Sequence, residues 1–224
     1  MPDIDLAQPI GALAVALPGA TAVFRRHKLD FCCGGSVSLA EAAAARALDP
    51  AAIAAELAML APAEAEMPAD PAGLVALIVS RFHAGHRREL PELIRLSQRV
   101  EAVHRGKPGT PAGLADILSG LQAELIPHMA KEELILFPLL VAGPADPRAA
   151  MAAGPIARMR AEHDDCGAML EEVARVTSDL TLPAEACNSF RALYAGLAHF
   201  RDELTEHIHL ENNVLFPPFE ALVG

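Results

Sequence analysis

The chain has 224 residues, with 29 acidic against 18 basic side chains and a formal net charge of −11. This charge would repel a phosphate backbone, and no basic stripe with interleaved aromatic residues offsets it, so we do not expect nucleic acid as a partner. Hydrophobic residues make up 52% of the chain, largely because Ala is abundant, and Ala, Leu and Glu favour helix. We therefore expect an all-α fold.

The most apolar early stretch is IGALAVAL at 10–17. It is too short to span a bilayer, and acidic rather than basic residues precede it, so it predicts neither a membrane segment nor a secretory signal. The chain has four cysteines, two of them adjacent, which is not the pattern of a disulfide framework. These features predict a cytoplasmic protein in a reducing compartment.

The first part of the chain contains three or four short helical patterns between Pro and Gly residues. One pattern opens at Ser38 with Glu41 three residues later, which is the spacing of a capping box. Another opens at Asp49, with Pro50 at the first helical position. These signals predict a small helical domain.

The stretch APAEAEMPADP at 61–71 is the expected linker, because Pro and Ala-Glu repeats interrupt the helical pattern there. We accordingly expect the small domain at 1–66 and a larger domain at 67–224. The Ala-rich faces of the small domain are candidates either for a homodimer contact or for its own core.

The stretch LDFCCGGSVSL at 29–39 places two adjacent thiols, Cys32 and Cys33, before two glycines. We expect a loop that allows close backbone approach, and a helix start at Ser38 that lowers the pKa of the thiols. A bond between adjacent cysteines needs a strained ring, so reversible redox chemistry or metal contact is favoured over a structural disulfide. We expect Cys187 to be a small buried hydrophobic residue.

Four long apolar-periodic segments follow the linker, each bounded by Gly, Pro or a capping residue. Asp70–Pro71 opens the first and Thr110–Pro111 opens the second. The four segments are expected to run to about Arg105, to about Val141, over roughly 154–178 and over roughly 183–216. Long helices with short connections predict an antiparallel up-down four-helix bundle, whose core receives one face from each helix.

The pattern HxxxExxxLFP occurs twice, as HMAKEELILFP at 128–138 and as HIHLENNVLFP at 207–217. A step of four residues turns a helix by about 400°, so the His and Glu of each copy share one face. A His and a carboxylate projecting inward from each of two helices is how a bundle builds a two-metal carboxylate site. Leu and Phe continue the buried stripe, and the Pro limits the helix.

The other two helices must supply further ligands at the same depth. The third offers His163 in RAEHDDCG, and the first offers His83 and His86 in RFHAGHRREL, either of which reaches the site if the helix kinks at Pro91. His104 lies about 31 Å from His83 along a straight helix, beside the connection, so the geometry predicts that it is not a ligand.

The remaining histidines fit ordinary structural positions: His209 lies about 200° around the helix from His207, and His27 and His199 lack a carboxylate at ligand spacing. Cys166, one turn from His163, is either a packing residue near the site or a thiol open to oxidation.

The expected metal ligands are thus four imidazoles and two carboxylates: His83, His128, His163, His207, Glu132 and Glu211. Shared between two metals, they give each ion two nitrogens and two bridging oxygens. An oxo or hydroxo bridge makes five ligands and leaves one open position per metal. Nitrogen and oxygen donors without thiolate suit iron or manganese more than a structural zinc, and we expect two iron ions per chain.

These residues resemble the iron-sulfur cluster repair di-iron proteins, whose C-terminal domain is hemerythrin-like and whose N-terminal domain carries a cysteine pair. The resemblance spans nearly the whole chain, and DFCCGG is its most distinctive part. It implies the same six ligands, with His83 from the HxxH stretch and His163 from EHD. The family sometimes counts the match to His104 as a ligand, against the helical geometry. Glu124 and Glu162 match family positions near the iron, where they would handle protons, and otherwise are ordinary solvated charges.

The resemblance implies that the protein responds to nitrosative or oxidative stress by restoring damaged iron-sulfur clusters, by supplying iron. Damaged iron-sulfur proteins would be its partners, and nitric oxide or oxygen its small ligand. Two other functions remain open from the residues. One is a non-catalytic carrier or sensor of oxygen or nitric oxide. The other is a nitric oxide reductase in which Glu124 or Glu162 handles protons.

Overall fold

A computed structural model describes residues 4–60, 68 and 70–222 of the chain. Within these ranges every regular element is a helix, apart from one isolated bridge between Pro9 and Ser38, and the predicted all-α class is confirmed. No helix in the described part of the chain is long and apolar enough to cross a membrane. Most of the expected linker at 61–71 and the expected boundary at 66/67 lie outside the described residues.

The N-terminal part is built from four short helices: α1 (Ile10–Ala16), α2 (Ala20–Arg26), α3 (Leu39–Ala45) and α4 (Pro50–Ala58). The capping box at Ser38 and Glu41 is present, and Asp49 accepts a hydrogen bond from the backbone N–H of Ala51 at 2.9 Å. These caps satisfy N–H groups that a short helix leaves without partners. Four alanines lie in the core of this part, Ala14, Ala20, Ala42 and Ala43, whereas others, such as Ala44 and Ala51, are exposed.

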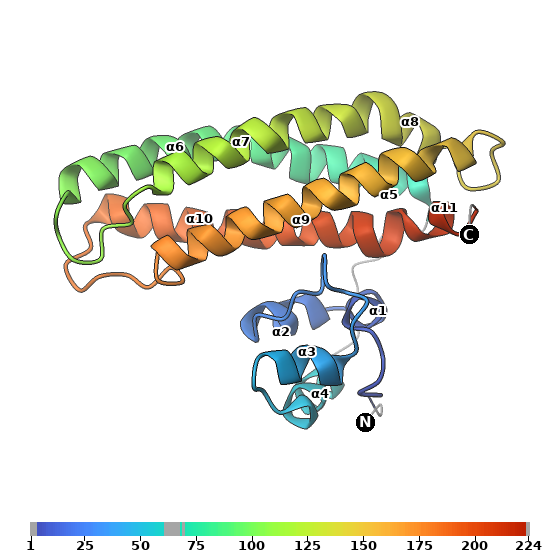
Figure 1. Ribbon diagram of the computed structural model, residues 1–224, viewed down its shortest axis with the longest axis horizontal. Helices are drawn as coiled ribbons and strands as arrows, with labels where there is room; N and C mark the ends of the chain where they lie inside the picture. The colour runs from blue at the N-terminus through green and yellow to red at the C-terminus, as the bar shows by residue number, and fades with distance from the viewer. Residues whose placement is uncertain (1–3, 61–67, 69, 223–224) are drawn as a thin grey trace.

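The rest of the chain forms four long antiparallel segments that lie side by side (Figure 1). Each runs through more than one kind of helical turn. The first is α5 (Pro71–Leu77), η1 (Ile78–His83) and α6 (Ala84–His104); the second is α7 (Leu114–Lys131), η2 (Glu132–Leu136) and α8 (Phe137–Leu140); the third is η3 (Ala149–Ala152) and α9 (Ala153–Val176); the fourth is α10 (Asn188–Leu210), η4 (Glu211–Leu215) and α11 (Pro217–Glu220). The predicted up-down bundle is confirmed.

Two helix starts differ from those predicted. Thr110 does not cap the second segment, because its hydroxyl donates to the carbonyl of His104 at 2.6 Å, and α7 starts four residues later behind Gly113 with φ 85°. The fourth segment begins at Asn188 instead of about 183, because the carbonyl of Pro183 accepts from Ala186 N–H in a turn and Cys187 takes the N-cap position.

Three of the segments contain a π-helical turn, namely η1, η2 and η4. In both copies of the repeat the Glu carbonyl accepts from the N–H five residues later: Glu132 from Phe137, and Glu211 from Phe216 at 2.9 Å. The following proline has no N–H and cannot continue the normal helical hydrogen bonds. The LFP tail therefore produces a wide turn that begins at the Glu, a feature frequent at functional sites.

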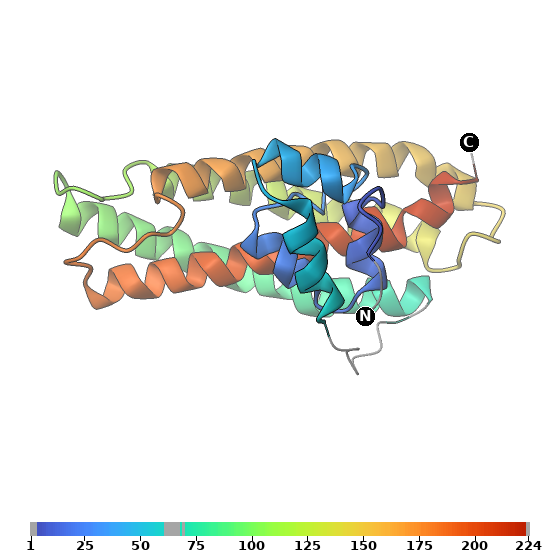
Figure 2. The same cartoon turned by 90° about the horizontal axis from the view of Figure 1, so that it is seen from below.

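The bundle interior is divided into two apolar clusters along its length. One includes Leu90, Leu125 and Leu204, and the other includes Phe82, Leu136 and Phe216. The small domain packs against one side of the bundle, over α9 and α10 (Figure 2). The connection between α2 and α3, which carries the two thiols, reaches the bundle at the boundary between the clusters.

Candidate metal centre

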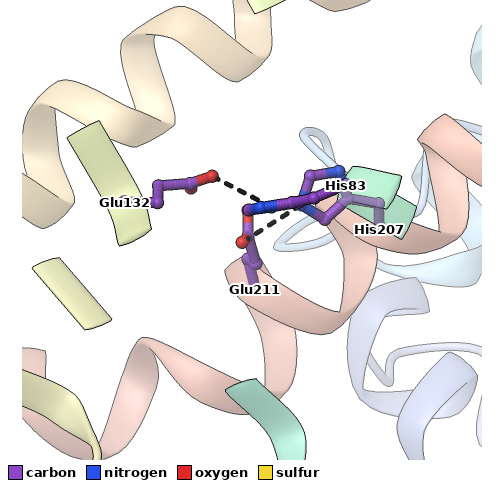
Figure 3. A group of neighbouring side chains, drawn as sticks. All are labelled: His83, Glu132, His207 and Glu211. Atoms are coloured by element: carbon purple, nitrogen blue, oxygen red, sulfur yellow. Dashed lines mark hydrogen bonds and ion pairs between the residues drawn. The ribbon is translucent and has the colours of Figure 1, made fainter. Parts of the chain in front are cut away.

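At this boundary the structure brings together the six side chains expected as metal ligands. They form two groups of four whose ligand atoms lie within 4.8 Å of one another, and both groups contain Glu132 and Glu211. The first group adds His83 and His207 (Figure 3). The second adds His128 and His163. All six residues are at most 1% exposed.

In the first group the two imidazole Nε2 atoms, of His83 and His207, are 3.1 Å apart. In the second group the Nε2 atoms of His128 and His163 are 3.2 Å apart. Donor atoms about 2.1 Å from one metal, at angles of about 90–110°, are about 3.0–3.4 Å apart. Each imidazole pair therefore has the spacing of two neighbouring ligands of one ion.

Glu132 divides its two oxygens between the pairs: Oε2 lies 3.4 Å from His83 Nε2, and Oε1 lies 3.2 Å from His128 Nε2.

Glu211 does the same, with Oε1 3.2 Å from His207 Nε2 and Oε2 3.1 Å from His163 Nε2. Each carboxylate thus presents one oxygen to each pair of imidazoles, which is the arrangement of a bridging ligand between two metals.

The missing hydrogen-bond partners of the two carboxylates also fit a bound metal. Among the described residues, all four oxygens of Glu132 and Glu211 are buried without a hydrogen-bond partner. Leaving buried carboxylates in this way is costly, and buried charges are normally paired or bound to metals. Two cations between the carboxylates would compensate both charges.

The site is electrostatically coupled. Burial and the charge of Glu211 raise the pKa of Glu132. Contacts with His128 and His83 lower it by a larger amount, so the pKa of Glu132 lies below its usual range. Burial lowers the pKa of His128, whereas the carboxylates of Glu132, Glu211 and Glu162 together raise it to about 9. The two acids are therefore ionised at neutral pH, and at least one imidazole binds a proton where a metal would bind.

Three of the four imidazoles are held from outside through Nδ1. His83 Nδ1 lies 2.7 Å from Glu133 Oε1, and His128 Nδ1 lies 2.9 Å from Glu162 Oε2. His163 Nδ1 lies 2.9 Å from the amide oxygen of Asn212. Such outer partners fix the tautomer that points Nε2 inward. Sequence reasoning missed Glu133 and Asn212, although each directly follows a Glu of the repeat.

The two acids expected to handle protons have different surroundings. Glu162 contacts Lys131 and also binds His128 and Arg158; burial raises its pKa, but these three partners lower it to about 2. A carboxylate so firmly ionised suits the holding of His128 better than proton exchange. Glu124 is exposed, and its charge contributes to raising the pKa of the Cys166 thiol.

The other histidines lie outside both groups. His86 is buried against Phe200 and His207, and burial lowers its pKa to about 2. The Nε2 atom of His104 lies 3.3 Å from Cys187 Sγ, at the connection end of α6. His209 faces the small domain, with its ring centroid 5.2 Å from that of Phe31.

The cysteine loop lies against α9. Cys33 Sγ is 3.7 Å from the carbonyl oxygen of His163 and 3.8 Å from Cys32 Sγ. Asp30 shapes the loop by accepting from the N–H groups of Cys33 and Gly34, each at 3.0 Å. The expectation that the helix start at Ser38 lowers the thiol pKa is wrong for Cys32, because its hydrogen bond with Cys33, burial and the charges of Cys33 and Asp30 raise it.

The other two cysteines differ in environment. Cys166 is 2% exposed, and burial together with nearby negative charge raises its pKa to about 12, so it is a packing residue with little thiolate. Cys187 is exposed, contrary to the prediction, because the late start of α10 places it at the N-cap.

Comparison with known proteins assigns both parts of the chain. Residues 77–219 match the hemerythrin HHE cation binding domain, and residues 6–61 match a domain of unknown function, DUF542. The fold and the buried His and Glu residues thus define a hemerythrin-like metal-binding protein with an added N-terminal helical domain.

Three relatives are each named iron-sulfur cluster repair protein YtfE. The protein from Musicola paradisiaca is 50% identical over 212 residues, which cover 93% of this chain and 94% of the relative. Those from Citrobacter koseri and Escherichia coli O157:H7 are 48% and 46% identical over 220 residues, covering 97% of each chain. The chain belongs to the iron-sulfur cluster repair protein family.

Proposed function

We propose that this protein holds two iron ions between its four central helices and uses them to repair iron-sulfur clusters. The observation that carries the first half is the division of both carboxylates: each presents one oxygen to each imidazole pair, with the four contacts between 3.1 and 3.4 Å. The ligands would be the six buried residues already described: His83, His128, His163, His207, Glu132 and Glu211.

The chain's own residues prepare this site for exchangeable metal. Apolar clusters on both sides exclude water from the carboxylates, and Glu133 and Glu162 hold two imidazoles with Nε2 inward. Two iron ions in this place, joined by an oxo or hydroxo bridge, would supply redox chemistry, an open position for nitric oxide or oxygen, and iron to hand on.

Metal analysis with an optical spectrum tests the site. The purified protein should hold about two irons per chain and show the absorption of an oxo-bridged pair. Replacing the shared ligand in Glu132→Ala should lower the content below one iron, whereas replacing the unshared His207 in His207→Ala should leave about one. Equal losses in both variants would contradict the bridging role of Glu132.

The second half of the proposal rests on the relatives and on the thiols. The relatives are named for iron-sulfur cluster repair, and they match this chain across both domains. The cysteine pair lies beside the second imidazole pair, with Cys33 Sγ 3.7 Å from the His163 carbonyl oxygen. We infer that the loop meets iron leaving the site or a damaged cluster approaching it, and that damaged iron-sulfur proteins are the partners.

A repair assay separates this function from the alternatives. The iron-loaded protein should restore the activity of an enzyme whose cluster nitric oxide or peroxide has damaged. The double variant Cys32→Ser with Cys33→Ser should repair less while keeping its iron. An unchanged repair rate would remove the thiols from the mechanism. Turnover of nitric oxide with an electron donor would instead indicate a reductase, and reversible binding alone would indicate a carrier or sensor.

A further inference from the structure

The outer partner of His163 differs in kind from those of His83 and His128. Those two imidazoles are held by carboxylates, of Glu133 and Glu162, whereas His163 is held by the neutral amide of Asn212. A carboxylate only accepts hydrogen bonds, but an amide accepts through its oxygen and donates through its nitrogen. Asn212 therefore has a donor left for a second partner.

That second partner is the cysteine loop. The Asn212 amide nitrogen donates to the backbone carbonyl of Cys32 at 3.1 Å, while its oxygen accepts from His163 Nδ1–H at 2.9 Å. The Asn212 side chain is buried, so water cannot replace either hydrogen bond, and losing one leaves a buried polar group without a partner, which costs free energy. One amide thus joins a metal ligand on α9 to the backbone of the thiol pair in the other domain.

A neighbouring asparagine supports the loop without touching a ligand. The Asn213 amide nitrogen donates to the carbonyl of Phe31 at 3.1 Å and, over a longer distance, to that of Cys32 at 3.4 Å. A Cβ added at Gly35 would lie only 2.9 Å from the Asn213 amide oxygen, so the second glycine of DFCCGG leaves room for the Asn213 side chain. Asn213 fixes where the loop lies, whereas Asn212 connects it to the centre.

The connection depends on which nitrogen of His163 carries the proton. In the absence of a metal, Nε2 of His163 lies 3.2 Å from Nε2 of His128 and 3.1 Å from Oε2 of the Glu211 carboxylate, so a neutral His163 can carry its hydrogen on Nε2, facing that carboxylate. In that tautomer Nδ1 is an acceptor, and the Asn212 amide must turn its nitrogen toward His163 and withdraw it from the Cys32 carbonyl, which keeps only the longer bond from Asn213 at 3.4 Å. A metal on Nε2 removes this alternative, because Nδ1 must then carry the hydrogen.

We propose that Asn212 is a positioning residue that couples metal binding to the docking of the cysteine loop: metal on His163 orients the amide that holds Cys32 beside the centre. This inference rests on the proposed role of His163 as a ligand. By linkage, docking of the loop also strengthens metal binding by the same factor. The two thiols are then held beside the centre when it contains iron, and they move away from it when it contains none.

The test measures thiol modification in the full-length protein with and without metal. Mn²⁺ is the probe, because it prefers nitrogen and oxygen ligands to thiolates and so protects cysteines only through docking. N-ethylmaleimide labelling, mapped by mass spectrometry, gives separate rates for Cys32 and Cys33, and exposed Cys187 is the internal standard. In the wild type we expect Mn²⁺ to slow labelling of the pair about 5-fold or more.

Two variants divide the amide's functions. Asn212→Asp keeps the acceptor for His163 but lacks the donor for Cys32, so it should keep its metal and lose the protection. Asn212→Leu should lose protection and bind metal more weakly. As a matched control, Asn213→Ala should label faster overall while keeping the ratio between the metal-free and metal-bound rates. Glu133→Gln perturbs the other half of the centre and should keep this ratio once saturated with Mn²⁺.

The metal content of the same samples separates the two proposals. If the wild type binds two metals but Asn212→Asp is protected as strongly as the wild type, the coupling through Asn212 is wrong and the proposed function stands. The same conclusion follows if metal does not slow labelling in the wild type. If the wild type binds neither iron nor Mn²⁺, the proposed centre fails and the coupling fails with it.

Discussion

Glu132 and Glu211 show what it costs a bundle to bury two carboxylates in a candidate metal site. Two carboxylates of like charge lie fully buried between apolar clusters, and their oxygens have no hydrogen-bond partner among the described residues. Only the surrounding imidazoles offset the cost of burial, by lowering the pKa of both acids. The metal-free form should therefore be strained at these two residues.

Glu132→Leu tests this strain. The leucine keeps much of the volume, removes one buried charge and relieves the repulsion with Glu211, so the metal-free variant should be more stable than the metal-free wild type by roughly 1–3 kcal/mol. Urea unfolding of chelator-stripped protein at pH 8 measures the difference. Under saturating iron the order should reverse, because the variant has lost a bridging ligand.

Glu133→Leu is the matched control, since Glu133 is the next residue but is partly exposed and paired with Arg87. It should not gain stability when metal-free. A metal-free Glu132→Leu that unfolds at lower urea than the wild type would show that the imidazoles fully compensate the two acids.

At the scale of elements, the π turns account for the position of the two buried carboxylates. Glu132 and Glu211, the carboxylates proposed to bridge the metals, each occupy the first position of a π turn, η2 or η4, and His83 ends a third. Pro217 lies two residues after the end of η4 and cannot donate the hydrogen bond that would restore a regular helix. The wide turn adds a residue to the helix and changes the direction of every side chain beyond it.

Pro217→Ala should therefore weaken metal retention. With an N–H restored at 217, the regular helix competes with the π turn and Glu211 loses its fixed direction. We expect metal to dissociate about 10-fold faster, an effect of the size found when outer contacts of ligands are lost. Loss of iron or Mn²⁺ to an excess of chelator, followed over time, gives the rate.

The adjacent Pro218 provides the control, because Pro218→Ala changes the same dipeptide without restoring the hydrogen bond at 217. Its dissociation rate should equal that of the wild type. Equal rates for all three proteins would mean that packing of Phe216 and Phe219, and not the proline, sets the turn.

The same elements show what the sequence could predict. Caps at Ser38, Asp49 and Asp70 were predictable, because a side chain bonds the backbone within a few residues. The spacing of the repeat also predicted which faces of the helices point inward. The sequence did not reveal the π turns: in η2 and η4 a proline competes with the helix around it, whereas η1 has no proline beside it.

Contacts between distant parts of the chain likewise could not be predicted from the sequence. Asn212 reads as one polar residue among several in HLENN, and only the docked loop shows that its amide has two partners 180 and 49 positions away. Cys187 was expected to be buried because a helix was expected to start near 183; its exposure follows from the turn at Pro183.

In the whole molecule, two domains of different chemistry meet at one interface. Charged pairs across it include Arg25 with Glu206 at 3.0 Å and Lys28 with Asp179. These pairs are partly exposed and contribute little each. The buried contacts of the loop with Asn212 and Asn213 are therefore the specific part of the interface, and they lie beside the candidate metal centre.

The pH dependence of metal binding should report the protonation of the buried imidazoles in the folded protein. The carboxylates raise the pKa of His128 to about 9, so in the folded, metal-free protein this imidazole is protonated at neutral pH. Metal needs its neutral form and must displace that proton. The apparent affinity for Mn²⁺ should rise with pH by up to about one tenfold step per unit for this proton, and level off above about pH 9.

The sign for folding is the opposite. A pKa raised above its ordinary value of about 6.5 stabilises the metal-free protein fully below that pH, and this contribution is lost as the pH rises through about 9. Competition of the protein with a chelator of known pH dependence, at pH 6.5, 7.5 and 8.5, measures the affinity, and urea unfolding of metal-free samples measures the stability. Rising affinity together with falling metal-free stability is expected. An affinity that does not change between pH 6.5 and 8.5 would show that no proton leaves His128 when the metal binds.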